Sequence, residues 1–271
     1  MAEKGLQPLT IRILSALVLA PVALALVYLG GVAFALLVGL AAALMAIEWS
    51  RLCQDTGGLV LEIATVLAVV GAVAAAALGA TEIALVATPL GAAAVLMLAA
   101  TRGGRPWWAA IGVIYVALPS IALIWLRALP EIGLGIVIWL FVAVWATDSL
   151  AYFTGRGLGG PKLAPRISPN KTWSGLAGGM LGAALAGGAL AAAFDLGPPL
   201  PMAGAGALVA LIAQAGDLWE SAVKRRFSVK DSGRLIPGHG GVLDRLDGMM
   251  SAAPALAAAM VIGGEGWLTW R

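Results

Sequence analysis

Apolar runs of about 20 residues recur along the whole chain, and they constrain the fold more than any other feature. A helix of that length spans the roughly 30 Å hydrocarbon core of a bilayer. Helices also satisfy their backbone polar groups internally, as a lipid environment requires. Of the 271 residues 61% are hydrophobic and 11% charged, which leaves too much apolar surface for water to cover. We therefore expect an all-α polytopic membrane protein.

The runs predict about nine transmembrane helices. They lie at residues 10–29, 31–47, 59–79, 82–100, 107–126, 131–153, 174–194, 200–220 and 247–264. Abundant glycine and alanine favour closely packed helices. The first run exceeds a usual signal core and is followed at once by another span, so we expect it to remain uncleaved. We divide the chain into N-terminal spans one to five, residues 1–130, and C-terminal spans six to nine with their catalytic loops, residues 131–271.

The lysines and arginines predict the orientation. With a cytoplasmic N-terminus, nine spans place 15 of the 17 basic residues on the cytoplasmic side and leave only Arg127 and Arg271 outside. This distribution follows the positive-inside rule. We expect a multi-pass protein of the cell (inner) membrane whose polar chemistry faces the cytoplasm, and the net charge of +3 requires no nucleic-acid partner. The single cysteine, Cys53, excludes an intramolecular disulfide.

Charged residues concentrate between positions 217 and 248. Asp217, Glu220, Ser221 and Lys224 are three or four residues apart, which predicts that they share one face of a helix. An acidic residue within or beside a membrane helix is a candidate functional residue. An ion pair of Asp217 or Glu220 with Lys224 is the structural alternative.

A glycine-rich turn follows, in the segment IPGHGGVLDRLDG at 236–248. Its backbone N–H groups could approach an anion closely, because glycines flank His239. Asp244 and Asp247 come next, three residues apart. Carboxylates suit Mg²⁺, and basic side chains bind phosphate, so the cluster predicts a metal and phosphate site; a basic patch for acidic lipid head groups is the alternative. The nearby cations are Lys224, Arg225, Lys230, Arg234 and Arg245.

A second polar cluster lies between spans six and seven. Asp148 and Tyr152 share a helical face, and residues 168–172 lie where the next helix is expected to begin, so that backbone N–H groups and the helix dipole favour anions. Helix capping by Ser168 and Thr172 is the alternative. The glycines here match neither a P-loop nor a dinucleotide fingerprint. The polar residues of that segment are Ser168, Asn170, Lys171 and Thr172.

The run SAVKRRFSVKDSGRLIPGHGGVLDRLD at 221–247 resembles the signature of the phosphatidate cytidylyltransferases, the CDP-diacylglycerol synthases. It has the serine, Lys-Arg, Lys-Asp, Pro-Gly-His-Gly-Gly, Asp-Arg and final Asp of that pattern. Upstream, DSLAYFTGRGLGG and SPNKTWSG are similar to a second block of the family. Asn170 and Ser174 depart from it, because lysine and glutamate are common there.

This resemblance implies a metal-dependent enzyme of phospholipid biosynthesis that transfers CMP from CTP to phosphatidic acid. It implies Mg²⁺, with a second metal or K⁺. We expect Asp217 and Asp244 as principal ligands, Asp247 as a supporting or bridging carboxylate, and Asp231 as a further candidate. No strong general base is needed, because the lipid phosphate is already anionic near pH 7.

The remaining expected roles concern phosphate and substrate. Catalytic residues are expected among Lys224, Arg225, Lys230, His239 and Arg245, with His239 positioning rather than accepting a proton. Substrate binding is assigned to Ser221, Lys171, Arg156, Ser168, Gly238, Gly240 and Gly241. Glu48 and Asp148 are further candidates, although pairing of either with a neighbouring arginine is the favoured interpretation.

Two other classes compete with this interpretation. A CDP-alcohol phosphatidyltransferase would carry an Asp-Gly-x-x-Ala-Arg pattern, whereas Met249, Met250 and Ser251 follow Asp247–Gly248 here. A membrane transporter of a phosphorylated or anionic solute would place polar residues near the bilayer midplane in repeated halves. The acids and cations instead crowd one predicted face. The expected partners are CTP, phosphatidic acid and the lipid bilayer, and a homodimer is left open.

Overall fold

The structure is a computed structural model that describes residues 21–53, 58–233, 235 and 240–263. In this part of the chain, eight helices are long and apolar enough to cross a membrane, which confirms the all-α polytopic prediction. They are α2 (Gly31–Cys53), α3 (Gly58–Ala77), α4 (Thr81–Thr101), α5 (Pro106–Ala128), α6 (Gly133–Leu158), α7 (Trp173–Ala193), α8 (Pro199–Arg226) and α9 (Leu243–Gly263). The predicted span at 10–29 lies largely outside the described residues, and its part at 21–29 is helical.

Several helices continue beyond their apolar runs into charged sequence. The prediction ended one span at residue 153 and another at 220, whereas α6 reaches Leu158 and α8 reaches Arg226. At the other end of the glycine-rich turn, α9 begins at Leu243 rather than at residue 247. The apolar run of each helix ends where charged residues begin, whereas its backbone hydrogen bonds continue past that point. Much of the polar cluster is therefore carried by helix ends.

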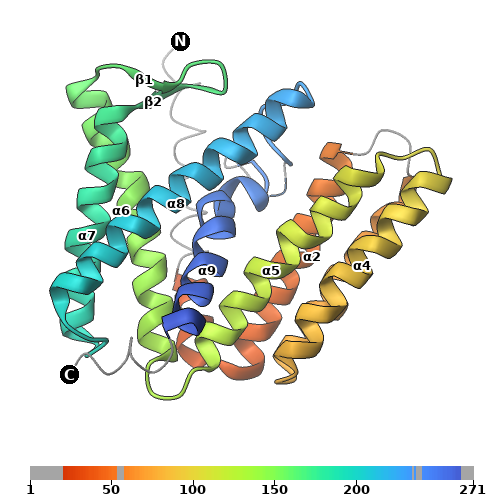
Figure 1. The fold of residues 1–271 in the computed structure, drawn as a ribbon, viewed down its shortest axis with the longest axis horizontal. Coiled ribbons are helices and arrows are strands. Elements are labelled where there is room, and N and C mark those ends of the chain that lie inside the picture. The colour runs from red at the N-terminus through yellow and green to blue at the C-terminus, as the bar shows by residue number, and fades with distance from the viewer. Residues whose placement is uncertain (1–20, 54–57, 234, 236–239, 264–271) are drawn as a thin grey trace, which may run out of the picture. The chain divides into compact units, whose positions relative to one another are not determined.

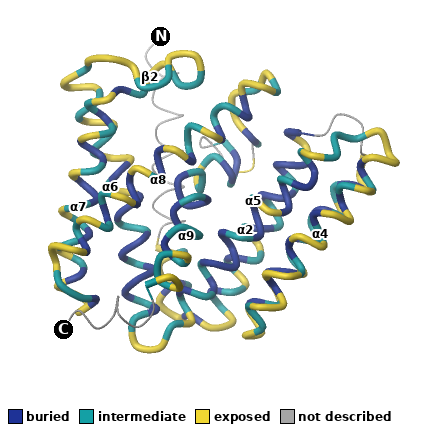
Figure 2. The backbone as a smooth tube through the Cα atoms, viewed as in Figure 1, coloured by how far each residue is buried: buried dark blue, intermediate teal, exposed yellow. Residues whose placement is uncertain are grey.

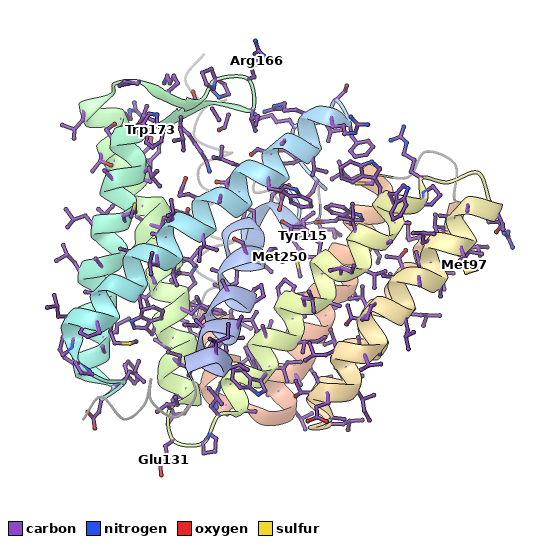
Figure 3. The ribbon with its side chains drawn as sticks, viewed as in Figure 1. Met97, Tyr115, Glu131, Arg166, Trp173 and Met250 are labelled. Carbon is purple, nitrogen blue, oxygen red and sulfur yellow. The ribbon has the colours of Figure 1, made fainter. Side chains whose placement is uncertain are left out.

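The connection between α6 and α7 forms a short β-hairpin. Strand β1 (Lys162–Ala164) pairs antiparallel with β2 (Ser168–Thr172), with Lys162 opposite Thr172 and Ala164 opposite Ser168. Arg166 lies at the tip of the hairpin, and Trp173 lies where α7 begins (Figure 3). Residues 168–172 lie directly before α7, as predicted, and Thr172 is its N-cap. Their extended pairing with β1 was not predicted.

Two compact units divide the described chain, and the first combines residues 1–125 with 227–246. Here α3 packs against both α2 and α4, which are labelled in Figure 1. Trp49 is fully buried, and its indole N–H donates to the backbone carbonyl of Trp108 at 2.8 Å. Gly112 lies directly against the Trp49 ring, because a Cβ there would come within 2.1 Å of it.

The second unit combines residues 126–226 with 247–271 and contains α6, α7, α8 and most of α9. Helix α7 packs against α6 and α8, and the buried residues of α7 are all glycine or alanine. Figure 2 shows buried and exposed positions alternating along α7. A Cβ at Gly178 would lie 2.1 Å from the Thr154 hydroxyl, and one at Gly206 would lie 2.4 Å from the Ala183 carbonyl. The prediction of close packing through small residues is confirmed for these helices.

Candidate active site

A pocket of about 670 Å³ lies within the second unit. Its walls come from α6, the hairpin, α7 and α8. Charged and amide side chains dominate its polar lining. They include Asp148, Arg156, Lys162, Asn170, Lys171 and Asp217. The two polar clusters of the sequence, one before α7 and one on α8, therefore contribute to the same cavity.

Asp217 is held between a lysine and a serine. Its Oδ2 lies 2.5 Å from the ammonium nitrogen of Lys171, which comes from β2. Its Oδ1 accepts a hydrogen bond from the Ser221 hydroxyl at 3.3 Å, one helical turn further along α8. The Lys171 ammonium is itself shielded from solvent. The structure thus brings Lys171, from one predicted cluster, to Asp217 and Ser221, which the sequence placed together in the other.

Two further carboxylates belong to the surroundings of Asp217. Asp247, in α9, interacts electrostatically with Asp217 and Asp148, and with the ammonium of Lys224. The backbone N–H of Gly248 donates to Asp247 at 2.7 Å. Within the described residues, no three Asp, Glu, His or Cys side chains are arranged as a group that could hold a metal ion. The predicted metal-binding roles stay predictions.

The mouth of the pocket carries basic and aromatic groups. The Arg156 guanidinium donates to the Tyr152 hydroxyl at 2.6 Å, and both residues line the cavity. Lys162 enters from β1. Arg225, near the end of α8, donates to the backbone carbonyl of Ile167 at 3.4 Å and so links α8 to the hairpin. These contacts hold cations where an anionic ligand could meet several of them.

Lys224 pairs with the carboxylate of Glu220. The ammonium and Oε1 are 3.0 Å apart across one helical turn, and Glu220 is fully buried. This is the ion pair that the sequence offered as the structural alternative for this helix face. A phosphate-binding role for Lys224 stays a prediction.

The glycine-rich turn belongs to the first unit, where Asp244 organises it. Its Oδ2 accepts hydrogen bonds from the backbone N–H of Ser232 at 2.9 Å, the Ser232 hydroxyl at 3.0 Å and the N–H of Gly241 at 2.9 Å. Gly240 has a φ of 88°, a conformation that favours glycine. Asp244 therefore fixes the path of the chain just before α9, and its predicted metal role stays untested.

Glu48, from α2, stands at the start of α9 within the same unit. Its carboxylate is buried and accepts from the backbone N–H groups of Val242 and Leu243, both at 2.9 Å. These are N–H groups that a helix leaves unpaired at its start. Added Cβ atoms at Gly233 and Gly241 would each lie 2.5 Å from the carboxylate. The described partners of Glu48 are backbone N–H groups and the Ser232 hydroxyl, which agrees with the favoured structural interpretation of this residue.

The other predicted site residues fall into two groups. Lys230, Asp231 and Arg245 are exposed in the first unit, and their roles stay predictions. Gly238 and His239 lie outside the described residues. Ser168 pairs with Ala164 in the hairpin, whereas Thr172 is the residue that caps α7, by accepting from the Gly175 N–H at 3.0 Å.

Sequence reasoning missed two residues of the pocket, Lys162 and Gln214. A signal for Gln214 was present, because it is a polar residue three positions before Asp217 in an otherwise apolar stretch. For Lys162 no comparable signal exists, since its placement depends on the unpredicted hairpin.

Comparison with known proteins gives a consistent result. A family model described as the cytidylyltransferase family matches residues 10–262. A protein of Brucella abortus named phosphatidate cytidylyltransferase is 42% identical over 259 residues, covering 90% of each chain. One of the same name from Pseudomonas aeruginosa is 36% identical over 283 residues, covering 94% of this chain and 98% of that one. Another, from Bacillus subtilis, is 42% identical over 151 residues, covering 54% and 55%.

Proposed function

Because the chain belongs to the cytidylyltransferase family, we propose that it transfers CMP from CTP to phosphatidic acid, with CDP-diacylglycerol and pyrophosphate as products. Relatives named phosphatidate cytidylyltransferase support this choice of lipid acceptor. The observation that carries the proposal is the pocket of the second unit, where carboxylates and cations from four elements line one cavity.

The pocket has the size and charge for anionic substrates. Its volume of about 670 Å³ lies in the range of about 300–1,000 Å³ that is typical of ligand sites. Arg156, Lys162 and Lys171 supply cations to its walls. Guanidinium and ammonium groups form charge-assisted hydrogen bonds with phosphate oxygens, which are stronger than neutral ones. A lipid phosphate and a triphosphate would both gain from this lining.

The proposed reaction is an in-line displacement. An oxygen of the lipid phosphate attacks the α-phosphorus of CTP and forms the new P–O bond. The bond from the α-phosphorus to the oxygen bridging to the β-phosphate breaks, and pyrophosphate leaves with that electron pair. A phosphate monoester has a second pKa of about 6, so the nucleophile is ionised at neutral pH without a general base. The basic residues hold the two anions together and offset their repulsion.

The carboxylates fit a hard divalent cation by their chemistry. Oxygen ligands of this kind suit Mg²⁺, and within the second unit Asp217 and Asp247, with Asp148 nearby, would hold it. When bound, Mg²⁺ neutralises charge on the attacking and leaving oxygens. In the structure the Asp217 carboxylate pairs with the Lys171 ammonium, so it already has one positive charge beside it.

We place the proposed site at the cytoplasmic face of the cell membrane. Helix α6 has Arg156 in its last turn, and α8 ends with Lys224, Arg225 and Arg226. Both helices therefore end in basic residues at the pocket side, as the positive-inside rule favours for cytoplasmic ends. A soluble nucleotide could enter from water there, and a lipid could enter from the bilayer.

A direct assay tests the proposal. Purified full-length protein in detergent receives CTP labelled in the α-phosphate, phosphatidic acid and Mg²⁺, and label in the lipid phase is counted. We expect CDP-diacylglycerol together with pyrophosphate in equal amounts. Folded protein that forms neither product would contradict the proposed reaction. Omission of phosphatidic acid is the control for hydrolysis of CTP.

A further inference from the structure

Gln214 is a polar residue in the wall of the pocket of the second unit. Only 7% of the residue is exposed, and its side chain lines the cavity. Among the described residues, the buried side-chain polar atom that lacks a hydrogen-bond partner is the Lys171 ammonium nitrogen, and no atom of Gln214 is left buried in this way. The Gln214 amide lines the same cavity as Lys171, where a group that enters can meet it.

The side chains of α8 change from apolar to charged around Gln214. On one side lies Asp217, three residues or about 4.5 Å of helix further on, followed by the basic end of the helix. On the other side, residues 199–213 contain no polar side chain. Gln214 is thus the first polar side chain of α8 and stands where the apolar stretch meets the charged one.

A glycerophospholipid has the same order of groups. Its phosphate is anionic, the ester carbonyls of the glycerol backbone follow, and the acyl chains come last. With the phosphate near Lys171 and Arg156, the ester carbonyls would fall toward the apolar side of Asp217. An amide N–H₂ donates hydrogen bonds, and an ester carbonyl only accepts them. A nucleotide offers no apolar end to match the stretch before Gln214.

We propose that the Gln214 amide donates a hydrogen bond to an ester carbonyl of phosphatidic acid and so positions the lipid phosphate for the transfer. This assignment rests on the proposed function. It makes Gln214 a substrate-binding residue that distinguishes diacyl lipids from ether lipids, which lack the carbonyls.

The test compares two lipids of equal chain length, diacyl phosphatidic acid and its dialkyl ether analogue, in mixed micelles with the full-length protein. For the wild type we expect kcat/KM to be about 5- to 10-fold higher on the diacyl lipid, as one hydrogen bond allows. Gln214→Leu should lose that preference by falling on the diacyl lipid alone, with the KM for CTP unchanged. Ser251→Ala, a change at a hydroxyl that donates to the Ile212 carbonyl outside the pocket lining, should keep the preference.

The possible outcomes distinguish failure of the Gln214 assignment from failure of the proposed CMP transfer. Equal kcat/KM of the wild type on both lipids would overturn the assignment without any variant, even if Gln214→Leu failed to fold. An equal fall of Gln214→Leu on both lipids, or a higher KM for CTP, would also overturn it and would place the amide in packing or on the nucleotide. No transfer by the wild type to either lipid would instead contradict the proposed function.

Discussion

Around the turn before α9, the carboxylates of Glu48, from α2, and Asp244, from the first turn of α9, accept hydrogen bonds from backbone N–H groups and from Ser232. In the pocket, Asp217 instead meets a lysine and a serine and faces a cavity. Glu48 is buried, whereas 24% of the Asp217 side chain is exposed. Backbone donors cannot move away without unfolding the turn, whereas side-chain partners can be exchanged for a ligand. A carboxylate can therefore stabilise the fold in the first unit and be available to a ligand in the second.

The sharpest test of this contrast is Asp217→Asn. The amide is nearly the same size but carries no charge, so it cannot balance Lys171 or a metal ion. We expect turnover to fall by at least about 100-fold, as for loss of a charged group at a reacting centre. The transfer assay measures the loss. The melting temperature in detergent should stay close to that of the wild type.

Glu62→Gln is the matched control for Asp217→Asn. Glu62 pairs with the exposed Arg51 at 2.9 Å, and neither residue has an assigned role in the site. The Glu62→Gln variant should retain full transfer activity. If Asp217→Asn kept activity near the wild-type level, Asp217 would be removed from the reaction and the contrast between the two units would fail.

Glu48→Ala tests whether the Glu48 carboxylate stabilises the turn before α9. It leaves two buried backbone N–H groups and the Ser232 hydroxyl without their acceptor, and we expect a loss of about 2–4 kcal/mol in the free energy of unfolding. Thermal unfolding in detergent measures it. Glu48→Gln keeps the shape and one carbonyl acceptor, so its loss should be smaller. An unchanged melting temperature for Glu48→Ala would mean that the turn does not depend on this carboxylate.

Gly178→Ala probes the helix packing that supports the pocket. The added Cβ would lie 2.1 Å from the Thr154 hydroxyl, so α6 and α7 must separate, and we expect a loss of about 1–3 kcal/mol. Gly204→Ala, in α8, is the matched control because a Cβ there meets nothing within 4 Å. It should melt at or above the wild-type temperature. Equal effects of the two changes would show that backbone propensity, rather than contact, decides stability at Gly178.

The sequence predicted most of the fold because membrane spans depend on a local property. Eight described helices lie where apolar runs predicted them, since length and hydropathy suffice for a span. The hairpin was missed because its strands are short, and neither Lys162–Ala164 nor Ser168–Thr172 shows the alternation of a half-buried strand.

The candidate site was predictable by residue type but not by grouping. Charges in an apolar chain identified Asp217 and Lys171 separately, because each is costly in a membrane protein unless it is used. Their contact depends on the hairpin that brings Lys171 to α8. The role of Glu48 was not predictable either, because its partners are backbone N–H groups almost 200 positions away, and no pattern of side chains encodes such a contact.

Thr172 gives the smallest expected effect and joins the two sides of the comparison, because it caps α7 and also lines the pocket. Thr172→Ala removes the acceptor of the Gly175 N–H, and we expect a loss of about 1 kcal/mol in the free energy of unfolding. Thr172→Ser keeps the hydroxyl and should restore the stability, as measured by thermal unfolding of both variants. If Thr172→Ala lost transfer activity without losing stability, and serine restored the activity, the hydroxyl would contact substrate rather than the helix. Structural and reactive roles would then occur together at the start of α7, rather than in separate units.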